Sequence, residues 1–131
     1  MSERDRNLEL VRSTFEAFDA EDVAGVVAVL HPDIESHVSP KMMNGGTWNG
    51  VDGYFVMTGA WFEAWEGLRY EVVELEAPDD QHVLATAHQT AMGRESGVPV
   101  EMDVVFLFEI EDGRARRFHV YPDYGSAVAA L

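Results

Sequence analysis

The chain contains no cysteine among its 131 residues. This absence excludes disulfides, thiol nucleophiles, and zinc or iron–sulfur sites built on cysteine. The five histidines show no His-x-His or HExxH spacing, and the sequence has neither a glycine-rich phosphate loop nor a GxSxG motif. We therefore expect no metal site, no cofactor and no Ser-His-Asp catalytic triad.

Basic residues are scarce, because nine Lys and Arg residues stand against 24 Asp and Glu residues, and Lys41 is the single lysine. The net charge of −15 would repel phosphate backbones and anionic membranes. Apolar runs are too short to cross a bilayer, and the charged first segment, MSERDRN, has no apolar core. We expect a cytoplasmic protein with neither nucleic acid nor membrane as a partner.

Length and composition indicate one globular domain. The 131 residues are 47% hydrophobic, and the sequence contains no repeat, linker or low-complexity segment. We therefore predict a single domain over residues 1–131.

Apolar residues at helical spacing predict three helices. In the first, they recur every three or four residues from Leu8 to Phe18, which places them on one stripe. Asp22 is a plausible N-cap of the second, which ends before His31-Pro32 because the proline ring disfavours continued helix. The predicted helices run over Arg4–Asp19, from Asp22 to Leu30, and over Asp52–Trp65.

Alternating apolar residues predict strands over Ile34–Val38, Leu68–Glu76, Gln81–Met92, Val98–Ile110 and Arg114–Tyr121. Asp112-Gly113 predicts a tight hairpin turn, because both positions tolerate positive φ. Ser39–Asn49 reads as a loop, although it carries two methionines and Trp48. A flap over a pocket, chain-end packing or a dimer contact would each explain this apolar content.

Three segments, FEAFDAEDVAGVVAVLHPDIESH, GTWNGVDGYF and FEIEDGRARRFHVYPD, follow one another in an order that resembles the SnoaL-like branch of the NTF2-like superfamily. This group includes polyketide cyclases, ketosteroid isomerase and limonene epoxide hydrolase. The resemblance implies an α+β fold, a cone-shaped barrel in which three helices pack on a curved, mixed, mainly antiparallel sheet. It also implies a homodimer formed through the outer face of the sheet.

The resemblance does not carry over the catalytic groups of ketosteroid isomerase. The positions that match its tyrosine, its aspartate base and its protonated acid fall on or near Phe15, Val38 and Val104, none of which ionises. The Asp-Arg-Asp relay of limonene epoxide hydrolase has no counterpart either. The aldol cyclases of the SnoaL type, which use an acid/base group in an apolar aromatic cavity, remain the most general match.

His88 is the first candidate for that acid/base group. Strand alternation puts it on the side of Leu84, Thr86 and Met92, which we assign to the cavity, and an imidazole can exchange a proton near neutral pH. A structural histidine, hydrogen-bonded inside the core, is the alternative. His37, near the vacant base position, is the second candidate and could instead close the adjoining loop by a hydrogen bond.

The predicted walls of a ligand pocket are Phe15, Trp48, Tyr54, Trp61, Thr86, Met102, Val104, Phe106 and Phe118. Alternation puts His119 and Tyr121 on the opposite side of the sheet with Asp103 and Arg117, although a bulge would reverse this. Asp123 is expected to cap the C-terminal tail.

Two hypotheses for function follow. The chain is a pocket protein for a hydrophobic small molecule, with cofactor-free cyclase or isomerase activity by acid/base chemistry. Alternatively, it is a non-catalytic ligand-binding or dimeric interaction module of the same fold. A cavity plugged by Phe15, Phe106 and Trp61 would argue against the enzyme.

Overall fold

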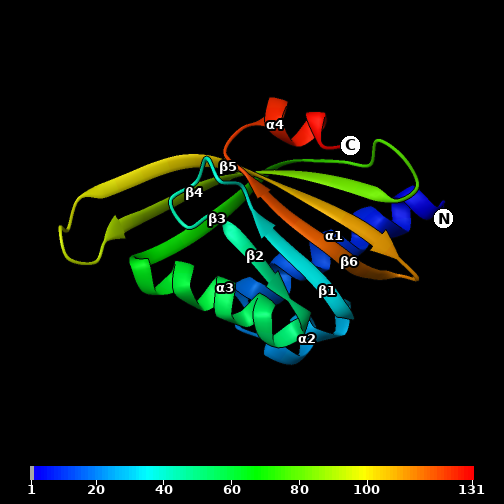
Figure 1. The fold of residues 1–131 in the computed structure, drawn as a ribbon, viewed down its shortest axis with the longest axis horizontal. Helices are drawn as coiled ribbons and strands as arrows, with labels where there is room; N and C mark the ends of the chain where they lie inside the picture. The colour runs from blue at the N-terminus through cyan, green and yellow to red at the C-terminus, as the bar shows by residue number, and fades with distance from the viewer. Residues whose placement is uncertain (1) are drawn as a thin grey trace.

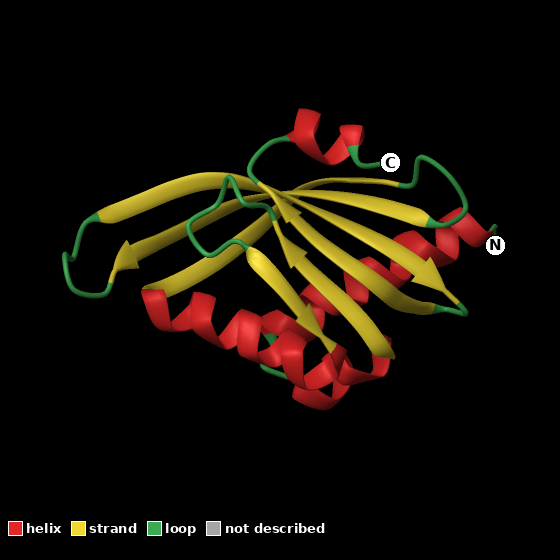
Figure 2. Ribbon diagram, viewed as in Figure 1, coloured by secondary structure: helices red, strands yellow, loops and turns green. Residues whose placement is uncertain are grey.

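The structure is a computed structural model that describes residues 2–131. Within them, six strands form one sheet in the order β2-β1-β6-β5-β4-β3, in which only β1 and β6 are parallel neighbours. Three helices lie on one side of the sheet and a short fourth helix lies on the other (Figure 1; Figure 2). The elements are α1 (Glu3–Asp19), α2 (Val23–Val29), β1 (Leu30–Val38), β2 (Gly46–Asn49), α3 (Gly50–Ala64), β3 (Trp65–Glu76), β4 (His82–Gly93), β5 (Pro99–Glu111), β6 (Arg114–Tyr121) and α4 (Tyr124–Ala129).

This arrangement confirms the predicted α+β fold with a mixed, mainly antiparallel sheet. Asp22 caps α2, because its carboxylate accepts a hydrogen bond from the backbone N–H of Gly25 at 3.0 Å. The hairpin between β5 and β6 turns at Asp112 and Gly113, whose φ values are 52° and 73°. Positive φ at both positions is what a tight turn between twisted strands requires.

Two elements differ from the predicted pattern. The segment read as a loop over Ser39–Asn49 ends in the short strand β2, which pairs antiparallel with β1. The C-terminal tail contains α4, which Asp123 caps by accepting the backbone N–H of Ser126 at 2.7 Å. The sheet is therefore one strand wider than predicted, and a helix lies on the face that was predicted to form the dimer.

The two faces of the sheet have different partners. We call the face that packs against α1, α2 and α3 the inner face, and the opposite one the outer face. On β5, Val104, Phe106 and Phe108 belong to the main core on the inner face. Val105 and Leu107 alternate with them and pack under α4.

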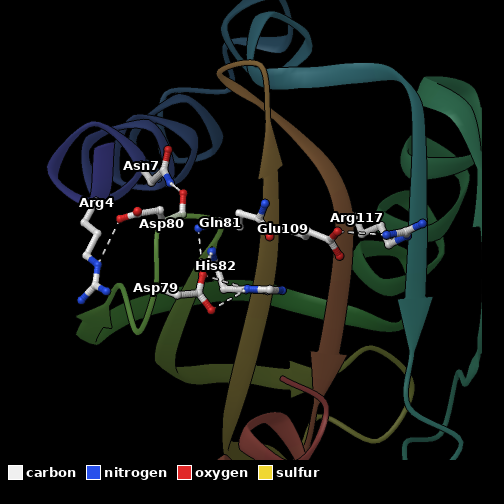
Figure 3. Close-up of polar contacts among 8 residues, drawn as sticks. All are labelled: Arg4, Asn7, Asp79, Asp80, Gln81, His82, Glu109 and Arg117. Carbon is white, nitrogen blue, oxygen red and sulfur yellow. Dashed lines mark hydrogen bonds and ion pairs between the residues drawn. The ribbon is translucent and has the colours of Figure 1, made fainter. Parts of the chain in front are cut away.

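Helix α1 contacts the turn between β3 and β4 through a hydrogen bond and an ion pair (Figure 3). The side chain of Asn7, which is only 5% exposed, donates to the carbonyl of Asp80 at 2.8 Å, and Arg4 pairs with the Asp80 carboxylate at 3.3 Å. Asp79 in turn accepts from the backbone and ring of His82. These contacts fix α1 across the inner face and so define one wall of the space beneath it.

None of the helices in residues 2–131 has the length and apolarity needed to cross a bilayer.

Candidate functional site

A cavity of about 70 Å³ lies between the helices and the inner face. Most of its wall is apolar, and its aromatic members are Phe15, Phe18, Tyr54, Trp61, Phe62, Tyr70, Phe106, Phe108 and Phe118. Edge-to-face and stacked contacts hold these rings, such as that between Phe106 and Phe118 at a centroid distance of 5.5 Å. The cavity is about half the size of an engineered cavity of about 150 Å³ that holds benzene.

One buried amide provides the main polar feature of the cavity. Gln89 is 1% exposed, and its Oε1 accepts the indole N–H of Trp61 at 3.0 Å. Its Nε2 donates to the sulfur of Met102 at 3.5 Å. Sulfur is a weak acceptor, so this donor is available to a better one.

The titratable groups among the described residues that line the cavity are two phenols. Burial raises the pKa of Tyr54, and the neighbouring Tyr70 raises it further. Burial also raises the pKa of Tyr70, an effect that the neighbouring Trp61 indole opposes only in part. Both phenols therefore keep their protons at neutral pH and offer hydrogen-bond donors rather than bases.

A buried acceptor on the wall has no partner. Asn44 Oδ1 is buried and receives no hydrogen bond from the residues that the structure describes, although Asn44 lines the cavity. The hydroxyls of Thr14 and Thr58, in contrast, donate hydrogen bonds to backbone carbonyls of their own helices. Asn44 is thus the polar group on the wall that a ligand donor would satisfy.

Six of the predicted wall residues line the cavity: Phe15, Tyr54, Trp61, Val104, Phe106 and Phe118. Met102 lies on the inner face but does not line the cavity, and it contacts Gln89, which does. Trp48 packs into the core from β2 and does not line the cavity either. Thr86 lies on the outer face, opposite Val105, so its prediction as a wall residue is wrong. Gln89 and Tyr70 were missed, although strand alternation with Ala85 and Ala87 was the available signal for Gln89.

The prediction that His88 faces the cavity is wrong. The register pairs His88 with Asp103 and Gln89 with Met102, so His88 lies on the outer face. Its Nδ1 donates to Asp103 Oδ1 at 2.8 Å, and its Nε2 lies 3.6 Å from Glu101 Oε1. The hydrogen bond to Asp103 is the main reason that the pKa of His88 is raised.

His37 also lies on the outer face and does not line the cavity, so it is not placed to act as its acid/base group. Its Nδ1 is 3.1 Å from Thr47 Oγ1, which is the loop-closing contact considered above. Its ring stacks on His119 at a centroid distance of 4.8 Å, and His119 stacks on Tyr121 at 6.0 Å. The alternation therefore placed His119 and Tyr121 correctly.

The row of His37, His119 and Tyr121 borders a second, open space of about 700 Å³. We call it the outer groove. The loop after β1 and the start of β2 form its other wall. The imidazoles are the titratable side chains that line it apart from the Tyr121 phenol. Burial, followed by the neighbouring His37 ring, lowers the pKa of His119 to about 4, so this imidazole is neutral at physiological pH.

Arg117 and Asp103 share the outer face, as predicted. Arg117 bonds to Glu35 at 3.0 Å and to Glu109 at 2.9 Å, so it acts as a cross-strand pairing residue. Within residues 2–131, no group of three or more His, Asp or Glu side chains is placed to hold a metal ion.

Comparison with known proteins agrees with this architecture. A family model described as a SnoaL-like domain matches residues 11–118. No match is found among functionally characterised proteins.

Solved structures share the whole fold. An NTF2-like protein of unknown function from Burkholderia pseudomallei has a TM-score of 0.81 at 23% identity, over 98% of this chain and 97% of that one. A candidate SnoaL-like polyketide cyclase from Jannaschia sp. CCS1 has a TM-score of 0.80 at 19% identity, over 97% and 92%. TerC, co-crystallized with polyporic acid, has a TM-score of 0.79 at 22% identity, over 96% and 97%. The match to the family model over residues 11–118 shows that the chain belongs to the SnoaL-like domain family, and the solved structures show that it has the NTF2-like fold.

Proposed function

We propose that this protein binds a compact, neutral and largely apolar small molecule in the cavity on the inner face, without catalysing its conversion. The observation that carries the proposal is the chemistry of the wall, which combines aromatic side chains with neutral hydrogen-bonding groups. Burial of an apolar ligand in such a space contributes about 25 cal/mol per Å² of apolar surface removed from water. TerC, which shares the fold, was co-crystallized with a small molecule, and this supports a ligand in the same fold.

The size of the cavity limits the ligand. Pockets for drug-sized ligands measure about 300–1,000 Å³, whereas this cavity measures about 70 Å³. A ligand of a few heavy atoms therefore fits the cavity as it stands, and a larger one requires a side chain to move.

Gln89 is the residue that we propose orients the ligand. Its carbonyl oxygen is occupied by Trp61, which leaves Nε2 directed only at the sulfur of Met102. A ligand carbonyl would replace the sulfur and make a stronger hydrogen bond. The preferred ligand thus carries an acceptor on an otherwise apolar body.

The catalytic alternative is less well supported. Cyclisation or isomerisation by acid/base chemistry needs a group that accepts a proton, and the pKa values of Tyr54 and Tyr70 are both raised by burial. Both histidines first considered for this role lie on the outer face. The candidate polyketide cyclase among the related structures keeps the alternative worth an assay.

The proposal is tested with two small probes, xenon and butanone, whose binding is followed by NMR. Both should bind, and Gln89→Leu should weaken butanone about fivefold, equivalent to about 1 kcal/mol for one hydrogen bond, while leaving xenon unaffected. Thr90→Val is the matched control, because Thr90 follows Gln89 on β4 and lies on the outer face. If neither probe perturbs the residues around the cavity, the proposal is wrong.

The same samples test catalysis. In deuterium oxide, butanone exchanges its α-hydrogens by loss and return of a proton, which an acid/base catalyst accelerates. We expect the rate with protein to equal the rate in buffer. Acceleration that Gln89→Leu abolishes would instead establish the enzyme.

The homodimer stays a prediction. Because α4 covers Leu84, Val105 and Leu107 on the outer face, a second copy would contact α4 or the strands beside it. Sedimentation equilibrium of the full chain over a range of concentrations tests this point.

A further inference from the structure

We infer that the inner cavity and the outer groove are two halves of one binding site, separated by the side chain of Met42, and that the site takes an elongated neutral amphiphile with an apolar chain and a hydroxyl head. This inference rests on the proposed function, because the apolar chain would occupy the same cavity. It adds a second subsite, which holds the head, and it identifies Met42 as the residue that sets the permitted length of the ligand.

The two spaces share a wall. Val38 and Met42 line both the cavity and the groove. Val38 is held in place by its position on β1, in register with Val120. Met42 belongs to the loop after β1, and its side chain is 9% exposed and packed into the core.

Met42 is the movable part of this wall. A methionine side chain is unbranched and has three rotatable bonds, so it changes shape at low cost. The loop around it is held by two backbone hydrogen bonds, from Met42 N–H to Ser39 at 2.9 Å and from Gly45 N–H to Met42 at 3.2 Å. Rotation of the side chain would therefore join about 70 Å³ of apolar space to about 700 Å³ of groove without unfolding the loop.

The groove suits a neutral polar head. None of the described residues that line it is a carboxylate, an arginine or a lysine. His119 makes ring contacts with His37 and Tyr121, while its nitrogens form no hydrogen bond within residues 2–131. A neutral imidazole offers one donor and one acceptor, which match the two hydrogen-bonding functions of a hydroxyl group.

An unpartnered atom in the same loop supports a ligand at this junction. Asn44 lies two residues beyond Met42 and lines the cavity, and its buried Oδ1 has no hydrogen-bond partner in residues 2–131. A buried acceptor in this state costs free energy that a donor would recover. A donor carried by the ligand would satisfy this acceptor.

The first test is a series of straight-chain alcohols from butanol to decanol, measured by titration calorimetry with the full chain. If the site continues into the groove, affinity rises about fourfold per added methylene past the length that fills the cavity. If affinity stops rising at butanol while xenon and butanol still bind, the cavity is bounded and the inference is wrong. If xenon and butanol fail as well, the proposed function is wrong and the inference fails with it.

Met42→Ala and Met92→Ala are a matched pair, because Met92 is 42% exposed and lines neither the cavity nor the groove. Met42→Ala should speed decanol association about tenfold, the effect of lowering a barrier by about 1.4 kcal/mol, whereas Met92→Ala should leave the rate unchanged. Equal rates in the two variants would contradict the role of Met42.

A measurement on the unmodified protein covers the case in which Met42→Ala does not fold. The ring signals of His119 should shift when decanol binds and stay fixed when butanol binds, because only the longer chain reaches the groove. A His119 signal that ignores decanol would overturn the inference. A signal that shifts with protein concentration, without alcohol, would show that a second copy covers the groove, and would overturn it too.

Discussion

The inner and outer faces of the sheet are built from alternate residues of the same strands, yet they differ in chemistry. On β4, Gln89 faces the cavity and is 1% exposed, whereas the adjacent His88 faces outward and pairs with Asp103. On β6, Phe118 lines the cavity while Arg117 bonds to two carboxylates. Groups that carry charge or exchange protons near neutral pH thus lie outside, and the inside is neutral.

The difference follows from the cost of burial. A charged group without a partner in a closed apolar space is strongly disfavoured, so a small cavity walled by aromatic rings keeps neutral donors and acceptors. The outer face is solvated and can hold ion pairs at little cost. A search for function that begins with histidines therefore leads to the wrong face of this sheet.

One part of the outer face resembles the inner face. Leu84, Val105 and Leu107 form an apolar patch on which Ala127 of α4, fully buried, packs. Side chains on either face are therefore apolar where a helix covers the sheet, and the direction of the side chain alone does not decide this.

The largest expected effect comes from adjacent residues on β5 that face opposite ways. Phe106→Ala should lower the free energy of unfolding by about 3–5 kcal/mol and Leu107→Ala by about 2–5 kcal/mol, because both remove buried side chains. Phe106→Ala also enlarges the cavity, so it alone should tighten binding of benzene. Chemical denaturation and benzene titration measure the two effects.

Val73→Ala is the control for this pair, because Val73 is 66% exposed and should change stability by less than about 0.5 kcal/mol. Equal benzene binding by the two β5 variants would mean that the cavity and the patch under α4 are not distinct sites.

The second effect concerns the acid stability of the outer groove. Burial lowers the pKa of His119 to about 4 from its ordinary 6.5. Between these two pH values the imidazole is protonated in the unfolded chain and neutral in the folded chain. Stability should therefore fall as pH drops from about 6.5 to about 4, and the loss should stop below that. The shift corresponds to at most about 3 kcal/mol, and to less in practice because the ring is partly solvated.

The measurement is the difference in free energy of unfolding between the unmodified protein and His119→Gln across this range. The difference removes the contribution of the carboxylates, which also titrate at low pH. A His119 ring signal that titrates at its ordinary pKa would refute the expectation.

Much of the fold was predictable, because local patterns determine it. The boundaries of β6, the cap at Asp22 and the turn at Asp112 follow from alternation, side-chain chemistry and positive φ. The strand β2 was missed because GTWN is short and begins with glycine. The helix α4 was missed because so short a helix depends on tertiary packing, here of Ala127, more than on its own sequence.

The site was less predictable than the fold. On β4 both alternating sets contain apolar residues, and the larger ones, Leu84 and Met92, suggested the wrong inner face. The inner set contains small residues such as Ala85 and Ala87, because aromatic side chains from the helices fill the space above them. The pairing of His88 with Asp103 would have corrected the assignment, but strand register is not evident from the sequence alone.

The smallest expected effect concerns the exposed cluster around His88. The hydrogen bond to Asp103, helped by the carboxylate of Glu101 nearby, holds the pKa of His88 above its ordinary value. A histidine whose pKa is raised in the folded state stabilises that state fully below the unfolded pKa, and the contribution disappears as pH rises through the folded pKa. Asp103→Asn should therefore lower stability at about pH 5 and have little effect at about pH 8.

Glu101→Gln is the graded control for this cluster, because Glu101 lies 3.6 Å from the ring against 2.8 Å for Asp103. Its effect should have the same sign and pH dependence and a smaller size. Histidine ring titration by NMR should show a downward shift of the His88 pKa in both variants, larger in Asp103→Asn, while butanone affinity stays unchanged. A change in butanone affinity in either variant would show that the outer cluster communicates with the cavity, and the separation of the two faces would then be structural but not functional.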